Sequence, residues 1–472
     1  MTVTVIGAFI LPAGLVCTLF RPAYLLPLLV ISSIFQAGSV VNGMIGSFAF
    51  GVPPFYFVAA CIAIRYLFLP RGQTKIFATR TDKIVTLLVA FWVFSLASSF
   101  ILPRVFAGIP VYSPREGIDE QFLYQTPLIW SLSNLSQGLF LTLDIIVILY
   151  ALNVVRTEKQ ADQLQKDFYI AALIVAAVGL CQYIALRQQW SFPYEIFDSN
   201  PVYSQGSEEV LGDWQRVSST FTEPSAAGAF LAAAGSGLLA AFLRGRRSLL
   251  HFLAIMVVLA VLLETTSTTG LVAFSITVSL LLVFFNPLAR KKVSGQSYAW
   301  GWVAIFACVV PAGILLLINP SLLEAVSMTT LDKSEGLSFL HRIAADGHAL
   351  GLAWDTYGLG VGLGSNRPSS LLTALLSTVG VLGTLLFIAM LYHILKAFRG
   401  RGEAPALQMS FWALIALMIG AFVAGPDLTS PVLWTVLTLV LVQLNTKFIG
   451  RVDATNGSAR LRAVQPPAGR VA

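Results

Sequence analysis

One polar stretch, residues 319–370 (the first block), holds most of the side chains in this sequence that could do chemistry. It contains two of the four histidines, His341 and His348, and two arginines, Arg342 and Arg367. Histidine titrates near neutral pH and can act as a general base. The planar guanidinium of arginine suits bidentate recognition of phosphate. These residue types together indicate acid–base chemistry on a phosphorylated substrate, and the alternative for each histidine is a structural role.

We predict a helix over residues 340–352 of this stretch. Such a helix places His341, Ala345 and His348 on one face, with Arg342 beside them. The stretch then runs into G-L-G-V-G-L-G-S-N-R-P-S-S from Gly358 to Ser370. This glycine series lacks the strand and helix of a dinucleotide-binding fold. Since glycine permits close approach of the backbone, we expect the series to lie against a ligand or a neighbouring helix.

A second candidate block, R-V-S-S-T-F-T-E-P-S, begins at Arg216. Pro224 suits the first turn of a helix, and Thr222 is the expected cap. A helix start offers free N–H groups and a positive dipole end, so Arg216 ahead of it predicts an anion site with Glu223 at its mouth. The alternative is an ordinary helix cap with an ion pair at the membrane surface.

A third block is the polar turn E-T-T-S-T-T-G between two apolar runs, Glu264 to Gly270. A carboxylate at the end of an apolar run costs free energy unless it is paired or hydrated. Glu264 is therefore a candidate partner for one of the arginines. Ser267 and the following threonines could line a cavity, or they could simply cap the next helix.

The elements that must position these blocks are transmembrane helices. The chain is 56% hydrophobic and 11% charged, with a mean hydropathy of +0.78, which is typical of a polytopic membrane protein. In lipid the backbone must satisfy its own hydrogen bonds, so the apolar runs are predicted as helices. The predicted fold class is an all-α helical bundle of 12–14 spans. Segments of bilayer length lie near 4–20, 22–36, 52–69, 84–102, 133–152, 168–186, 224–243, 248–263, 268–285, 301–318, 371–395, 406–424 and 430–446.

Basic residues in the loops predict the orientation of this bundle. With the loop at 70–83 in the cytoplasm, 23 of the 30 basic residues fall inside, so the N-terminus is predicted outside and the C-terminus inside. Residues 1–446 are then one transmembrane catalytic domain, and 447–472 form a disordered cytoplasmic tail. The outer loops of this domain are 103–132, 187–223 and 319–370.

Seven basic residues remain outside under this topology, and six of them are arginines. The orientation does not require them, so each needs another reason. We expect Arg104, Arg115 and Arg187 to pair with the many outer acids. Phosphate binding is the expected role of the other three arginines: Arg216, Arg342 and Arg367.

In the order of the chain, the blocks at Arg216, at Ser267 and at His341, followed by G-V-L-G at Gly380, resemble the O-antigen polymerase and ligase superfamily of bacterial envelope glycan assembly. The resemblance implies glycosyl transfer on the outer face of the inner membrane, from a glycan carried on undecaprenyl diphosphate. It implies no cofactor and no metal. The arginines would bind the diphosphate, Glu264, Ser267, Gly362 and Gly364 would support the site, and His341, His348 or Glu223 would be the catalytic base.

One departure separates the members of this family. Ligases of the family place a histidine shortly after the glycine motif, where this chain has Arg367-Pro368-Ser369-Ser370. A repeat-unit polymerase for exopolysaccharide or O-antigen is therefore the expected activity, and an O-antigen ligase or a lipid-linked glycan flippase are the alternatives. The partners implied are membrane lipids, chain-length regulator and flippase proteins. No P-loop or Rossmann fingerprint occurs, and no nucleic acid is expected.

Overall fold

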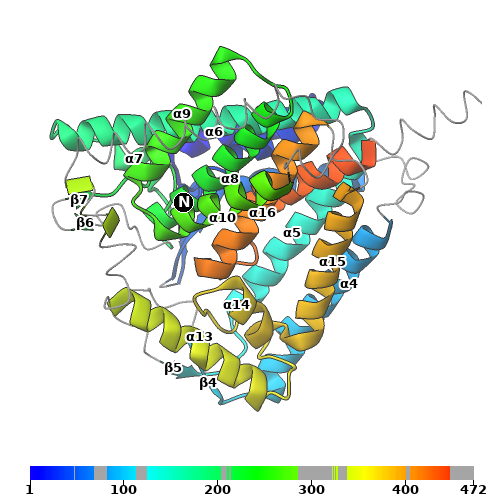
Figure 1. Cartoon of the computed structure of the whole chain (residues 1–472). Coiled ribbons are helices and arrows are strands. Elements are labelled where there is room, and N and C mark those ends of the chain that lie inside the picture. Colours follow the sequence, from blue (N-terminus) through cyan, green and yellow to red (C-terminus); the bar gives the residue numbers. More distant parts are fainter. Residues whose placement is uncertain are drawn as a thin grey trace, which may run out of the picture.

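The structure is a computed structural model that describes residues 1–46, 48–68, 82–112, 125–202, 210–211, 214–284, 321–322, 324, 326–327, 337–399 and 404–446. Helices dominate these residues (Figure 1), which confirms the all-α helical bundle. Within them, six helices are long and apolar enough to cross a membrane: α4 (Asp82–Val105), α5 (Leu132–Val154), α6 (Glu158–Arg187), α8 (Pro224–Leu243), α15 (Gly380–Arg399) and α16 (Pro405–Ala424).

Shorter elements complete the description. The shorter apolar helices are α1 (Val5–Leu19), η1 (Pro22–Tyr24) with α2 (Leu25–Ser32), α3 (Pro54–Leu67), α9 (Leu249–Glu264), α10 (Thr268–Phe284) and Pro431–Thr446. The other helices are α7 (Tyr194–Phe197), α13 (Leu337–Asp355) and α14 (Leu371–Thr378). All strand pairs are antiparallel: β1 (Thr2–Val3), β2 (Val41–Ile45) and β3 (Phe48–Val52) form one sheet, β4 (Pro110–Tyr112) pairs with β5 (Gln125–Pro127), and β6 (Val210–Leu211) pairs with β7 (Trp214–Gln215).

Two predicted spans are wrong in their bounds. The segment 371–395 is two helices, because Gly380 takes φ +67° and lets the backbone of residues 358–359 approach; a Cβ at Gly380 would lie 2.3 Å from the Gly358 carbonyl oxygen. Helix α6 starts ten residues earlier than predicted, at Glu158, where Thr157 and Gln160 form a capping box. The predicted span 301–318 and the predicted tail 447–472 lie outside the described residues.

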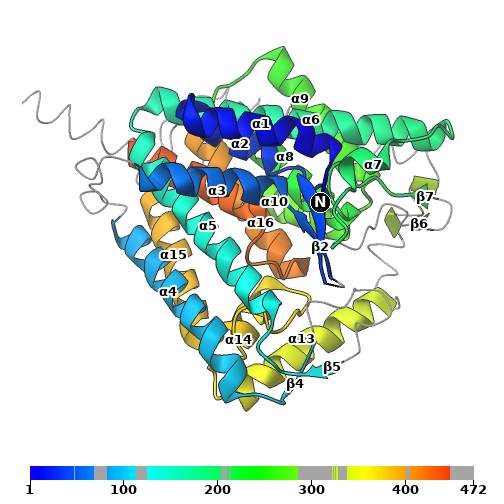
Figure 2. The same ribbon diagram turned by 180° about the vertical axis from the view of Figure 1, so that it is seen from behind.

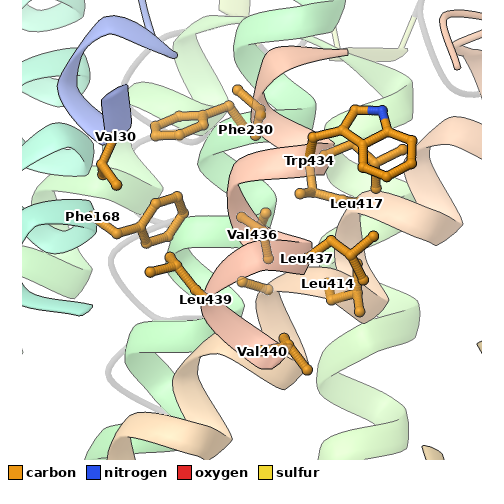
Figure 3. Close-up of a cluster of buried hydrophobic side chains, with 14 of the residues drawn as sticks. Val30, Phe168, Phe230, Leu414, Leu417, Trp434, Val436, Leu437, Leu439 and Val440 are labelled. Atoms are coloured by element: carbon orange, nitrogen blue, oxygen red, sulfur yellow. The ribbon is translucent and has the colours of Figure 1, made fainter. Parts of the chain in front are cut away.

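The core surrounds α8, whose many alanines and glycines let neighbouring helices approach closely. A Cβ added at Gly228 would lie 2.5 Å from the Ser267 Cβ, and one at Gly270 would lie 2.7 Å from the Gly228 carbonyl. Larger side chains fill the space around the last helix, where Phe168 and Phe230 face a row of valines and leucines (Figure 3). This packing fixes the second block, ahead of α8, against the third block, ahead of α10.

Contacts between helices place the predicted outer elements at one end of the bundle. Helix α4 runs antiparallel to α5, since Trp92 donates from Nε1 to Thr142 Oγ1 (3.0 Å) while Gly138 packs on Leu96. It is also antiparallel to α15, on which it packs, so α5 and α15 end on the same side, next to the loops predicted to be cytoplasmic. The hairpin β4–β5, α13 and α14 lie at the opposite end (Figures 1 and 2).

Asp144 lies in the middle of α5, and a carboxylate inside a span is costly unless it is paired. It is fully buried, and neither of its carboxylate oxygens has a hydrogen-bond partner among the described residues. The helical period predicts which residues are buried, but it does not predict their hydrogen-bond partners.

Candidate functional site

The second and third blocks meet through the side chain of Arg216. Its Nε donates to the Thr265 carbonyl oxygen (3.1 Å) and to Thr266 Oγ1 (3.1 Å). The next residue, Val217, donates its N–H to the Glu264 carbonyl oxygen (3.3 Å). The arginine therefore joins the segment before α8 to the turn before α10.

Gln182 of α6 holds the same segment from the other side. Its Oε1 accepts the N–H groups of Ser218 (3.1 Å) and Ser219 (2.7 Å). Two hydroxyls add anchors to distant backbone: Ser219 Oγ donates to the Val175 carbonyl oxygen (2.7 Å), and Thr220 Oγ1 donates to that of Ile34 (2.6 Å). Both hydroxyls therefore fix the loop.

The start of α8 corrects a predicted cap. Pro224 does occupy the first turn, but the capping residue is Glu223, not Thr222, and its side chain makes no capping bond. Instead, Glu223 Oε2 accepts the Ser225 hydroxyl (2.9 Å). In the turn before α10, Ser267 Oγ accepts the Gly270 N–H (3.1 Å), so this serine is the cap and Thr268 begins the helix.

Helix α13 carries the residues of the first block on three sides. Ala345 and Ala349 are fully buried on its packed face. At about 100° per residue, Arg342 and Asp346 flank that face on one side, and His341 and His348 flank it on the other. The predicted helix is confirmed and extends from Leu337 to Asp355. Its histidines and its arginine therefore meet different neighbours.

His348 lies against the hairpin β4–β5. Its Nε2 is 3.0 Å from the Pro110 carbonyl oxygen, and its Nδ1 is 3.5 Å from Gln125 Nε2. The ring also packs edge-on against Tyr112, with centroids 4.9 Å apart. In the neutral form with the proton on Nε2, both nitrogens are engaged, so the contacts of His348 serve to dock α13 on the hairpin.

Asp346 is a residue that the motif analysis did not single out. Its Oδ1 accepts the N–H groups of Ser369 (2.8 Å) and Ser370 (3.1 Å) and the hydroxyl of Thr373 (2.7 Å). Asp346 thus caps α14 from another helix. The signal available in the sequence was its position one helical turn after Arg342.

Arg342 and Arg367 lie on either side of the contact between Asp346 and the start of α14. Arg342 is one turn before Asp346, with Cβ atoms about 6 Å apart, and Arg367 is two residues before Ser369. Both side chains are half-buried. Neither guanidinium makes a hydrogen bond or ion pair with any residue that the structure describes, although the Arg367 N–H donates to the Tyr112 carbonyl oxygen (3.1 Å).

The outer end of α16 connects the three blocks. Gly420 packs on α8 and α10; its added Cβ would lie 3.6 Å from the Ala229 Cβ and 3.7 Å from Thr269 Cγ2. Five residues later, about 7.5 Å along a helix, the Gly425 N–H donates to the Ser369 carbonyl oxygen (3.0 Å). The arginines of the first block therefore lie at the same end of the molecule as Arg216.

The glycine series packs on helices, which confirms one of its two expected uses. Gly358, Gly360, Gly362 and Gly364 all have positive φ, between +77° and +98°. A Cβ at Gly362 would lie 2.8 Å from the Ser98 carbonyl oxygen of α4, and one at Gly364 would lie 2.7 Å from that of Ser133 in α5. These glycines fasten the loop that carries Arg367 to the ends of two spans.

We expect Gly362→Ala to lower the free energy of unfolding by about 2–5 kcal/mol, since it adds left-handed strain and a clash with backbone. Gly108 has φ +91° but no neighbour within 4 Å of an added Cβ, so Gly108→Ala isolates the strain. Thermal unfolding in detergent measures both variants. Equal losses of stability would show that close packing does not matter at Gly362.

We expect Asp346→Ala to destabilise the docking of α13 on α14 by about 2 kcal/mol, because two N–H groups and a hydroxyl lose their acceptor. Asp346→Asn keeps an oxygen at that place and should retain most of the stability. Asp355→Ala, an exposed carboxylate at the end of the same helix, is the control. Limited proteolysis between α13 and α14 reports the docking, and equal digestion of the two alanine variants would contradict the role of Asp346.

No group of three potential metal-ligating side chains occurs in the part of the chain that the structure describes. Comparison with family models and with curated proteins found no match to the chain. The arrangement of the site residues therefore carries the functional inference.

Proposed function

We propose that this protein is a membrane glycosyltransferase that polymerises undecaprenyl-diphosphate-linked oligosaccharide repeat units on the outer face of the bacterial inner membrane. The observation that carries the proposal is the pair Arg342 and Arg367. Two half-buried guanidinium groups flank the contact between Asp346 and the start of α14, and they have no partner among the described residues. Such groups suit a ligand with two phosphates, which supplies the missing acceptors.

The reaction needs few groups from the protein. The bond between the anomeric carbon of the donor glycan and the diphosphate oxygen breaks, and that oxygen keeps the electron pair. The acceptor hydroxyl oxygen bonds to the anomeric carbon, and its proton passes to a base. Arginines that face the diphosphate stabilise the charge that develops as it leaves. Arg342 and Arg367 are assigned this role, and Arg216 is assigned to the acceptor side of the site.

The loop after the glycine series favours polymerisation over ligation. Ser369 and Ser370, at the place where ligases of the resembling family have a histidine, are bound to Asp346 through their N–H groups. This segment is a structural cap and carries no side chain that could replace the histidine as a general base. The ligase activity is therefore not the one we propose.

A strain that lacks the protein tests the proposal. Loss of a polymerase leaves lipid-linked single repeat units exposed on the outer face of the inner membrane, whereas loss of a flippase leaves them on the inner face. The units are extracted, and their exposure is measured by labelling intact spheroplasts with a membrane-impermeant reagent for sugars. If outer single units do not accumulate, the proposed function is wrong.

A further inference from the structure

Backbone strain is concentrated along the outer half of α6. Four non-glycine residues in the described chain have positive φ: Gln189 (+56°) follows the end of α6, Ser219 (+55°) bonds to the Val175 carbonyl oxygen of that helix, and Thr266 (+44°) is held by Arg216, while the fourth is Tyr357. A β-branched residue in this region is an outlier. Strain of this kind persists only where the surroundings enforce it, and it gathers at functional sites.

Glu264, a buried carboxylate, lies at the same place. Glu264 is 5% exposed, and its Oε2 has no hydrogen-bond partner in the part of the chain that the structure describes. The charged and titratable groups around it are Arg187 and Tyr183 from α6 and Arg216 from the segment before α8. None of the described basic residues makes a direct ion pair with it. An unsatisfied buried carboxylate is costly and calls for an explanation.

A buried donor without a partner lies in the same cluster. Trp214 is 2% exposed, and its Nε1 makes no hydrogen bond with any described residue. The guanidinium of Arg187 lies 3.2 Å from the Trp214 ring centroid, and the Tyr183 ring centroid is 6.5 Å away. Arg187, which was expected to pair with an outer acid, attracts Glu264 without a direct ion pair and stacks on this tryptophan. One acceptor and one donor thus remain open around a single arginine.

We propose that this cluster is the acceptor-sugar subsite and that Glu264 is the catalytic base. A sugar offers what both open groups lack: a hydroxyl proton for Glu264 Oε2, and an oxygen lone pair for Trp214 Nε1. The inference rests on the proposed function and names the second substrate's place in the same site. The acceptor oxygen forms the new glycosidic bond, its proton moves to the Glu264 carboxylate, and the proton is later released to the departing diphosphate.

Two of the other base candidates, His348 and Glu223, have different tasks in the structure. His348 uses both ring nitrogens on the hairpin β4–β5. Glu223 is half-buried and already accepts the Ser225 hydroxyl. Glu264 is shielded from water, and it is carried by the turn that Arg216 fixes. These properties favour a carboxylate that acts on a bound hydroxyl over one that only caps a helix.

The experiment uses the full-length protein in proteoliposomes, with lipid-linked single repeat units purified from the deletion strain as donor and acceptor. Glu264→Gln keeps the size of the side chain and removes the base, so the rate of elongation should fall at least about 100-fold. The wild-type rate should fall at low pH as Glu264 becomes protonated, and this acid limb should be absent from the residual rate of the variant. Glu264→Asp should recover part of the rate.

Two further variants separate catalysis from folding. Trp214→Phe keeps the ring and loses only the N–H, so it should raise the KM for the acceptor about tenfold with little change in kcat. Glu195→Gln makes the same carboxylate-to-amide change on the exposed surface of α7 and should leave the rate unchanged.

Rates are referred to the amount of folded protein. If Glu264→Gln elongates within threefold of wild type and keeps the acid limb, Glu264 is not the base, although the proposed function stands. If Glu264→Gln fails to fold, Glu264→Asp and Trp214→Phe decide, and wild-type kinetics in both would overturn the subsite. If the wild-type protein forms no long chains from these units, the proposed function itself fails and the subsite falls with it.

Discussion

Arg342→Ala should abolish long chains while the amount and thermal stability of the protein stay near wild type. No described residue depends on the Arg342 side chain for a hydrogen bond, so its loss leaves no group without a partner. Its expected role is confined to the diphosphate, where removing one donor to a developing charge typically costs 100-fold or more, about 3 kcal/mol. Gel electrophoresis of the polysaccharide gives chain length, and single repeat units should accumulate.

Substitution by lysine sharpens this prediction. Arg342→Lys keeps the charge and loses the planar fork, so it should restore little of the chain length if both donors reach the diphosphate. Arg65→Ala is the control. Tyr56 near the start of α3 stacks on Phe140 near the start of α5, so Arg65 in the last turn of α3 lies toward the end of α5 that is away from α13. Long chains in Arg342→Ala at wild-type amounts would remove the phosphate site from the proposal.

The helix starts in the second and third blocks could be predicted from local signals. Pro224 and Ser267 mark helix starts on the same predicted side. The helix of the first block was also predicted, because apolar positions recur every three or four residues along α13. These features depend on residues within a few turns of one another, which is the range that periodicity and capping rules cover.

Contacts across longer separations could not be predicted in the same way. Asp346 reaches Ser369, 23 residues on, only because the glycine series folds the chain back through four left-handed residues. The break at Gly380 depends on that same fold. Arg216 and Arg342 were both expected to bind phosphate, yet Arg216 holds a turn and Arg342 has no described partner, while Arg187 stacks on Trp214. Their different roles come from neighbours that lie far away in the chain.

Arg216→Ala should also abolish long chains, but by a route that distinguishes it from Arg342→Ala. The Thr265 carbonyl oxygen and the Thr266 hydroxyl lose their shared donor, and the strained turn next to Glu264 loses its support. We therefore expect a loss of stability of about 2–3 kcal/mol as well. Thermal unfolding and chain length should fall together in this variant, whereas Arg342→Ala should lower chain length alone.

Lysine tests whether this role depends on the geometry of arginine. Arg216→Lys has no N–H at the position of Nε, so it should restore neither the turn nor the chains. The matched control is Arg104→Ala, at the exposed outer end of α4, where the guanidinium lies 5.1 Å from the Trp130 ring centroid. That variant should make chains of normal length. If Arg216→Ala keeps wild-type stability, Arg216 does not support the turn. The argument that this turn holds Glu264 beside the acceptor would then fail as well.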